Sequence, residues 1–217
     1  KTIKCTPNPK TKKNTPKKGR RLGVILPLID FAMLIYGIWG IMLKTKLMSE
    51  IKKLAPFVLK WEGGFVNDPA DKGGATNKGV TIAVWQKQGY DKNKYGKIDI
   101  KDLKNLSNED ATAIMKKHYW DRWKADQIKD QRIANILVDW LWCSGAWGIK
   151  IPQKILGLKV DGIVGEKTIT AVNNAPANFL QTLYKERQEF LERIAKTNPT
   201  QKKFLRGWLN RLDDLKK

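Results

Sequence analysis

Apolar residues recur at helical spacing through most of the chain from residue 49 onward, and one glycine-rich stretch interrupts them. In the first run, Ile51, Leu54, Ala55 and Val58 fall on one helical face, although Pro56 is expected to kink that helix. Residues 64–80 hold several glycines and are expected to form an irregular hairpin. The pattern predicts a mainly α fold, with further helices over residues 81–88, 107–120, 133–143, 149–158, 167–173, 177–196 and 201–215.

A single glutamate, Glu62, stands at the end of the first apolar face. Gly63 follows it and is expected to end the helix in the left-handed conformation. A carboxylate at such a boundary is half desolvated, and desolvation favours its protonated form. A carboxylic acid that stays protonated near neutral pH can serve as the general acid of a glycosidase.

A second carboxylate, Asp71, follows nine residues after Glu62. The four glycines between residues 63 and 74 permit turns that return the chain toward Glu62, and Thr76 and Thr81 place hydroxyls on the returning arm. One acid in an apolar wall and one carboxylate in a polar loop is the arrangement of glycoside hydrolysis. A helix end followed by a solvated hairpin explains the same spacing equally well.

The run over residues 61–81 also carries a set of short motifs in a fixed order. It reads Glu-Gly-Gly, then Asn-Asp-Pro, then Asp-Lys-Gly-Gly-Ala-Thr-Asn-Lys-Gly-Val-Thr. This order resembles the signature of glycoside hydrolase family 108, a group of bacterial and phage muramidases with a lysozyme-like helical fold. The resemblance implies that Glu62 is the general acid, and that Asp71 and Thr76 orient water or stabilise the transition state.

Downstream segments extend the resemblance over residues 49–217. Residues 118–121 look like the family's Tyr-Trp-Asp segment, and 139–145 look like its Asp-x-x-x-Asn-Ser-Gly helix, with Cys143 in place of the expected Asn. Residues 153–165 resemble the peptidoglycan-binding region, and 207–211 match the family's Gly-Trp-x-Asn-Arg. The resemblance implies a lysozyme-like catalytic domain over 49–145 and a helical peptidoglycan-binding region over 146–217, packed on it. The residues expected to contact substrate are Trp61, Asn67, Thr81, Tyr119 and Trp120.

The segment before residue 49 has a different composition. Residues 1–21 hold nine Lys or Arg and are expected to be a basic disordered tail. Residues 22–43 are mostly apolar and long enough for a transmembrane anchor. The higher density of basic residues before this run predicts a cytoplasmic N-terminus, which places the catalytic domain on the side of the periplasm or cell wall. Met48 would also suit the start of the family domain, so residues 1–47 could be foreign to the native product.

The net charge of +21 favours an anionic partner such as nucleic acid, lipid or cell-wall polymer. The chain carries no zinc-finger, GXXG or RNP pattern, so the prediction is peptidoglycan glycan strands and no nucleic acid. One histidine, His118, is too few for a His-rich zinc site, and we expect no metal or organic cofactor.

Residues 91–102 resemble a calcium-binding loop, with Asp91, Asn93, Asp99 and Asp102 at candidate ligand positions. Tyr95 stands where an oxygen ligand is needed, and Asp102 replaces the bidentate Glu. Four lysines in the loop outweigh its three aspartates, which disfavours a divalent cation. The alternative to a calcium site is a loop that keeps only the turn geometry.

Together these features predict a peptidoglycan muramidase that hydrolyses the β-1,4 bond between N-acetylmuramic acid and N-acetylglucosamine. Two alternatives stay open from the sequence. One is a catalytically weak peptidoglycan-binding scaffold, because a fold does not guarantee activity. The other is a lytic transglycosylase, which also uses one glutamate but releases anhydro-muramoyl ends without water. Asp71 favours hydrolysis, since a transglycosylase needs no carboxylate to hold water.

Overall fold

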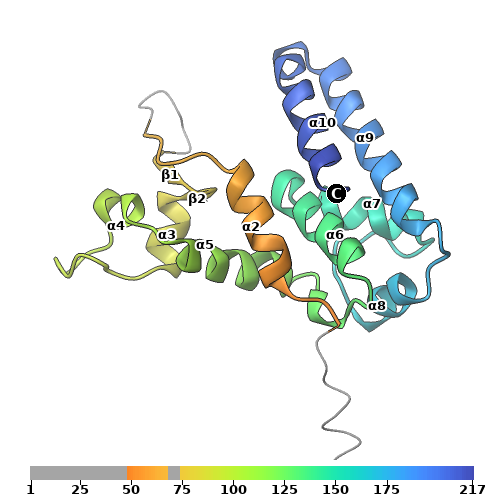
Figure 1. Cartoon of the computed structure of the whole chain (residues 1–217), viewed down its shortest axis with the longest axis horizontal. Coiled ribbons are helices and arrows are strands. Elements are labelled where there is room, and N and C mark those ends of the chain that lie inside the picture. The colour runs from red at the N-terminus through yellow and green to blue at the C-terminus, as the bar shows by residue number, and fades with distance from the viewer. Residues whose placement is uncertain (1–47, 68–73) are drawn as a thin grey trace, which may run out of the picture. The chain divides into compact units, whose positions relative to one another are not determined.

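A computed structural model describes residues 48–67 and 74–217, whose regular structure is mainly helical (Figure 1). The two strands, β1 (Thr76–Asn77) and β2 (Val80–Thr81), pair antiparallel. The helices before residue 131 are α2 (Ile51–Trp61), α3 (Ile82–Gln88), α4 (Ile100–Lys104), α5 (Asn108–Met115), the π-helix η2 (Lys116–Trp120) and the 3-10 turn η3 (Ala125–Gln127). The later ones are α6 (Gln131–Ser144), α7 (Trp147–Ile155), α8 (Glu166–Asn173), α9 (Phe179–Thr197), the 3-10 helix η4 (Pro199–Phe204) and α10 (Leu205–Asp214).

The mainly α fold with a small hairpin is confirmed, and the departures from prediction have local causes. Helix α2 runs through Pro56 without a break. Its last turn ends at Glu62, which takes an extended backbone with φ −80° and ψ 133°. Gly63 is not among the residues with positive φ, so the predicted left-handed cap at this position was wrong. The chain therefore leaves the helix at Glu62 itself.

Side-chain caps account for where several helices begin. Ser107 accepts a hydrogen bond from the Asp110 backbone N–H and Asp110 bonds back, which is a full capping box for α5. Asp99 and Asp102 form the same box at the start of α4, a helix that the sequence did not predict. The helix expected over 107–120 is continuous, but its hydrogen-bond pattern changes from that of an α-helix to that of a π-helix at Lys116.

The hairpin is held by its turn and by side chains that reach α4. Lys78 (φ 49°) and Gly79 (φ 75°) form the two-residue turn, with the positive φ at both positions that a type I′ turn needs. Asn77 is buried, and its amide donates to the Leu103 carbonyl at 2.8 Å. The Lys78 ammonium donates to the Leu106 carbonyl at 3.0 Å. These two hydrogen bonds therefore attach the hairpin to α4 and to the residues directly after it.

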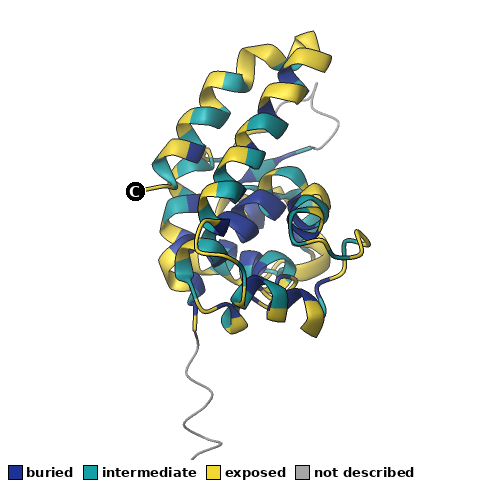
Figure 2. Ribbon diagram, turned by 90° about the vertical axis from the view of Figure 1, so that its right-hand side faces the viewer, coloured by how far each residue is buried: buried dark blue, intermediate teal, exposed yellow. Residues whose placement is uncertain are grey.

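Two apolar cores flank α2. The smaller one gathers residues of the hairpin, α3, α4 and α5 around Trp85, and Leu59 of α2 packs against it. The larger one is built on α6, whose residues Ile136 to Leu141 are all buried, and it takes in the other face of α2 together with α7 to α10. Figure 2 shows the buried residues gathered in the middle of the unit, whereas the far end of the α9–α10 hairpin is mostly exposed. Helix α2 thus lies between the cores, with Glu62 at its end.

The calcium-like loop uses its carboxylates on its own backbone. Asp102 is fully buried and accepts hydrogen bonds from the N–H groups of Lys92, Asn93 and Asp99. Asp91 accepts from the Gly96 N–H at 2.7 Å. Within the described residues, no cluster of three or more His, Cys, Asp or Glu side chains is placed to hold a metal ion. The hydrogen bonds fit the alternative of a loop that keeps its turn geometry.

The basic tail (1–21) and the anchor (22–43) lie outside the described residues, as does Asp71. In the parts that the structure does describe, no helix combines the length and the apolar character needed to cross a bilayer. The transmembrane anchor therefore stays a prediction from sequence alone.

Helix α10 is tied to α2 through Asp214. Its carboxylate accepts from the Lys60 ammonium at 2.8 Å and from the Trp61 indole N–H at 2.9 Å. The hydrogen bond from Lys60, followed by that from Trp61, lowers the pKa of Asp214 to about 2. These contacts hold α10 and α2, the last and first of the described helices, together.

Asp214→Asn should remove part of the acid sensitivity of folding. A carboxyl with a lowered folded-state pKa stabilises the fold above its unfolded value of about 3.9, and this stabilisation is lost as pH falls toward about 2. The variant should be less stable than wild type at pH 6, and the difference should shrink between about pH 4 and 2. Urea unfolding followed by circular dichroism at each pH measures it. Asp213→Asn, whose partner is the surface residue Lys216, is the matched control, and a gap that stays constant with pH would contradict this role of Asp214.

Candidate active site

The Glu62 carboxylate is held by two donors from distant parts of the chain. Its Oε1 accepts a hydrogen bond from the Trp142 indole N–H of α6 at 2.7 Å. The same oxygen accepts from Nη1 of Arg211 in α10 at 3.1 Å. The Glu62 side chain keeps 20% of its surface exposed, so it is half desolvated, as predicted, yet open to a ligand. Two donors on one oxygen fix the orientation of the carboxyl group.

Arg211 also binds a second, fully buried carboxylate, Asp139. Its Nη2 lies 2.7 Å from Asp139 Oδ1, and its Nε reaches the same oxygen at 3.3 Å. On the other side, Nη2 of the buried Arg187 lies 2.7 Å from Asp139 Oδ2. The chain of contacts runs Glu62–Arg211–Asp139–Arg187, with two carboxylates and two guanidinium groups, so its formal charges cancel when all four groups are ionised.

Burial and charge act in opposite directions on Asp139. Burial opposes the charged form of this carboxyl, but the adjacent guanidinium groups of Arg187 and Arg211 outweigh burial and lower its pKa. A buried carboxylate between two guanidiniums is strongly destabilised when one partner is removed, because an unpaired charge is left inside the protein. Asp139 is therefore a fixed anionic support that holds Arg211 in place beneath Glu62.

Gly79 of the hairpin turn packs directly against the other oxygen of Glu62. A Cβ at this position would lie 2.8 Å from Glu62 Oε2 and 2.4 Å from Cζ2 of Trp142. Only glycine leaves room for this contact. The positive φ of 75° at this position also favours glycine. The prediction that the glycine-rich segment returns to Glu62 is thus confirmed at Gly79.

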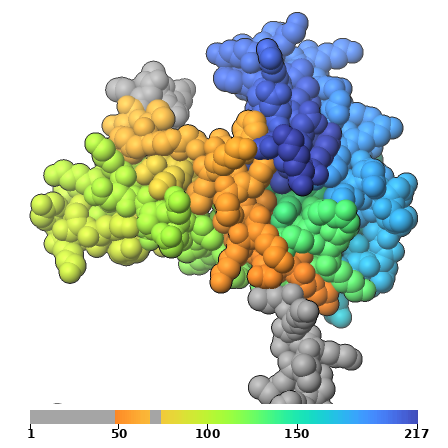
Figure 3. Space-filling view, in the orientation of Figure 1, coloured from red at the N-terminus to blue at the C-terminus, as the bar shows by residue number. Residues whose placement is uncertain are grey.

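The other oxygen of the carboxyl group, Oε2, receives no hydrogen bond from the described residues, whose two donors to Glu62 both bond to Oε1. Figure 3 shows the face of the molecule notched between the hairpin side and α10.

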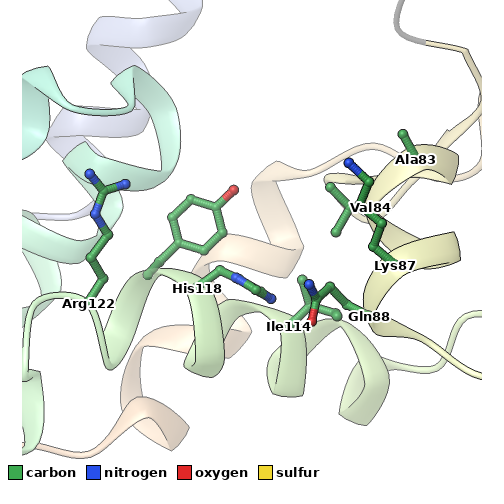
Figure 4. Close-up of a pocket in the computed structure, with 8 residues that line it drawn as sticks. Ala83, Val84, Lys87, Gln88, Ile114, His118 and Arg122 are labelled. Atoms are coloured by element: carbon green, nitrogen blue, oxygen red, sulfur yellow. The ribbon is translucent and has the colours of Figure 1, made fainter.

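Tyr119 extends the site along η2. Its ring centroid lies 4.6 Å from that of Trp142, at an angle of 55°. Burial, and after it the Glu62 carboxylate, raises the pKa of the Tyr119 hydroxyl. Tyr119 also lines a pocket of about 360 Å³ between α3 and the α5–η2 segment (Figure 4). The half-buried Tyr119 ring therefore lies between Trp142, which bonds to Glu62, and an open pocket.

The other residues predicted to contact substrate have diverse surroundings. Asn67 is exposed beside the isolated bridge between Val66 and Thr76. Thr81 is the N-cap of α3, and its hydroxyl accepts from the Val84 N–H at 3.3 Å. Trp61 is half-buried, with its indole N–H directed to Asp214 of α10.

Trp120 was wrongly predicted as a substrate contact. It is fully buried in the larger core, and its indole N–H donates to Asp126 at 2.6 Å. Tyr119 and Trp120 are adjacent in η2 and point to different sides, and of the two only Tyr119 is half-exposed. Thr76, predicted as a catalytic residue, lies in β1 between Val66 and Thr81, with its hydroxyl 3.4 Å from the Gly74 carbonyl.

Sequence reasoning missed Trp142, Arg211 and Asp139 as parts of the site. All three stand in motifs that were recognised, but the motif alone gave them no role. Cys143, which replaces an asparagine of the family pattern, is exposed, with its thiol 3.9 Å from Asp139 Oδ2. The available signal was a charged residue inside an apolar helix, since Asp139 interrupts the run of apolar residues in α6.

Gly79→Ala should destabilise the protein more than an equally strained control. Both Gly79 and Gly96 have positive φ, but a Cβ at Gly96 would meet nothing within 4 Å. Each alanine should lose about 1 kcal/mol for the left-handed backbone, and only Gly79→Ala should lose about a further 1–3 kcal/mol from overpacking against Trp142. Urea unfolding of both variants measures the difference. Equal losses would mean that Gly79 has space around it.

Comparisons with known proteins agree with this architecture. The family model described as Glycosyl hydrolase 108 matches residues 55–145, and the one described as Predicted Peptidoglycan domain matches residues 147–213. A comparison with curated proteins found no match. Among solved structures, the chain is similar to SagA of Brucella abortus, with 30% sequence identity, a TM-score of 0.59, and coverage of 76% of this chain and 90% of that one. With these matches in this order, the chain belongs to the glycosyl hydrolase 108 family.

Proposed function

We propose that this glycoside hydrolase of peptidoglycan is a muramidase, with Glu62 as its general acid. It would hydrolyse the β-1,4 bond between N-acetylmuramic acid and N-acetylglucosamine. The observation that carries the proposal is the asymmetry of the Glu62 carboxyl group. Oε1 is occupied by Trp142 and Arg211, whereas Oε2 faces the glycine of the hairpin turn.

This geometry supports a specific proton transfer. The protonated Oε2 donates its proton to the glycosidic oxygen while the bond from that oxygen to the muramic acid C1 breaks. Glu62 becomes a carboxylate in this step, and the donors already in place on Oε1 stabilise the charge that develops there. Arg211 and Trp142 therefore act on the product form of the acid.

The second half of the reaction adds water to C1. We assign Asp71, assisted by Thr76, to orient this water and take its proton, or to stabilise the positive charge at C1. Asp71 lies outside the described residues, and its role rests on its spacing from Glu62 and on the family resemblance. The water's oxygen forms the new bond to C1, which gives a reducing muramic acid end.

Glu62→Gln should lower the rate of peptidoglycan cleavage by roughly 10²- to 10⁴-fold, because the amide cannot donate the proton. Mass spectrometry of digested peptidoglycan identifies the products. Reducing muramic acid ends from the wild type that vanish in Glu62→Gln are expected. Glu192→Gln, an exposed residue of α9, is the control. Anhydro-muramoyl ends would instead indicate a lytic transglycosylase, and binding without any product would indicate a scaffold.

Arg211→Lys should reduce turnover although it keeps the charge. The guanidinium contacts Glu62 with Nη1 and Asp139 with Nη2 and Nε at once, a fork that a lysine ammonium cannot reproduce. With Glu62 less firmly oriented, kcat should fall on the order of tenfold to a hundredfold, whereas KM should change little. Steady-state kinetics well below the melting temperature of both proteins separate the two parameters. Unchanged kcat in a folded Arg211→Lys variant would rule out the orienting role.

A further inference from the structure

The pocket next to Tyr119 is a cavity that the cleavage chemistry leaves unused. Its volume is about 360 Å³, in the range of small-ligand sites. Figure 4 shows Arg122 on one side, Lys87 and Gln88 on the other, and His118 and Ile114 between them. Tyr119 lines the same pocket and packs at a tilt against Trp142, which bonds to Glu62. Tyr119 and Trp142 thus connect the pocket to Glu62, the proposed acid.

The lining of this pocket is cationic and rich in donors. Its residues include Lys87 and Arg122 but no Asp or Glu. Within the described residues, neither of these two cations forms a salt bridge, although many other surface cations do. A carboxylate entering the pocket would therefore meet positive charge that no acidic side chain there neutralises.

Two further groups in the pocket have hydrogen-bonding capacity to spare. His118 Nε2 is buried and, in the part of the chain that the structure describes, has no hydrogen-bond partner. A buried polar atom without a partner is uncommon and needs an explanation. The Gln88 carbonyl oxygen accepts from the Lys117 ammonium at 2.9 Å, which leaves the amide N–H groups of Gln88 to donate. Gln88 therefore adds a donor to the pocket, and His118 adds a ring nitrogen that can bond to a ligand or a water molecule.

We propose that this pocket binds a carboxylate of the stem peptide attached to muramic acid. The inference rests on the proposed function, since it assumes that a glycan strand lies across Glu62. In peptidoglycan, the peptide hangs from the lactyl group of the sugar whose C1 is attacked, and it carries free carboxylates. A strand placed with its scissile bond at Glu62 therefore brings the peptide close to the neighbouring pocket. Lys87 and Arg122 attract the carboxylate, and the apolar side chains of Val84 and Ile114 pack against its carbon atoms.

The test measures binding separately from cleavage. In the Glu62→Gln background, the full chain is titrated calorimetrically with N-acetylmuramoyl-tripeptide that has free carboxylates, and with its fully amidated counterpart. Lys87→Gln with Arg122→Gln should weaken binding of the free acid by about tenfold, the size of one charge-assisted hydrogen bond in a half-open site. Binding of the amidated peptide should not change. Lys129→Gln with Lys196→Gln, which removes the same charge from exposed positions elsewhere, is the matched control.

Each result has a defined meaning. Equal loss for both peptides would overturn the carboxylate assignment, and so would an equal effect of the control pair, which would indicate general charge attraction. If neither peptide binds more weakly to the Lys87→Gln, Arg122→Gln variant, the pocket is not the binding site of the peptide. A parallel digestion of peptide-free glycan strands by the wild-type chain tests the muramidase reaction alone. If these strands are not cleaved but selective peptide binding is retained, the proposed reaction is refuted and the assignment of the pocket is kept.

Discussion

The buried contact between Asp139 and two arginines organises the rest of the site. A carboxylate with no exposed surface needs paired charges, and here they come from α9 and α10. Arg187 satisfies one oxygen of Asp139, and Arg211 takes the other and continues to Glu62. Removing Asp139 would leave the buried Arg187 without its carboxylate partner inside the larger core. The orientation of the proposed acid is therefore coupled to the stability of the fold.

This coupling also joins the two family-matched regions. Glu62 and Asp139 lie in the glycosyl hydrolase match, whereas Arg187 and Arg211 lie in the predicted peptidoglycan domain. Asp214, from the segment just after that match, contacts Lys60 and Trp61 next to the acid. The C-terminal region is thus more than an attached wall-binding module, because it supplies a donor to the carboxyl group of Glu62. Separating the regions would leave Glu62 with Trp142 as its remaining described donor.

The sequence predicted those features that depend on local patterns. Helices with apolar faces and caps such as Ser107 were found within a few residues, and Glu62 was found because it ends such a face. Three kinds of feature lay beyond this reasoning. Arg211 meets Glu62 across 149 residues, a contact that no local pattern encodes.

The other two kinds concern backbone geometry. Tyr119 and Trp120 look equivalent as adjacent aromatics, and only the way η2 faces the larger core shows that Trp120 is the buried one. The end of α2 was misplaced because an extended Glu62, and not a left-handed Gly63, closes the helix.

Arg211 is shared between two carboxylates with different surroundings. Its Nη2 lies 2.7 Å from Oδ1 of the fully buried Asp139, and its Nη1 lies 3.1 Å from Oε1 of Glu62, whose side chain keeps 20% of its surface exposed. Because Asp139 is cut off from water, it depends on its guanidinium partners and holds Arg211 in place. Glu62 therefore receives a donor whose position is set by the buried contact and not by Glu62 itself. This arrangement suits the function proposed for Glu62, because donors that are already in place need no rearrangement during a reaction.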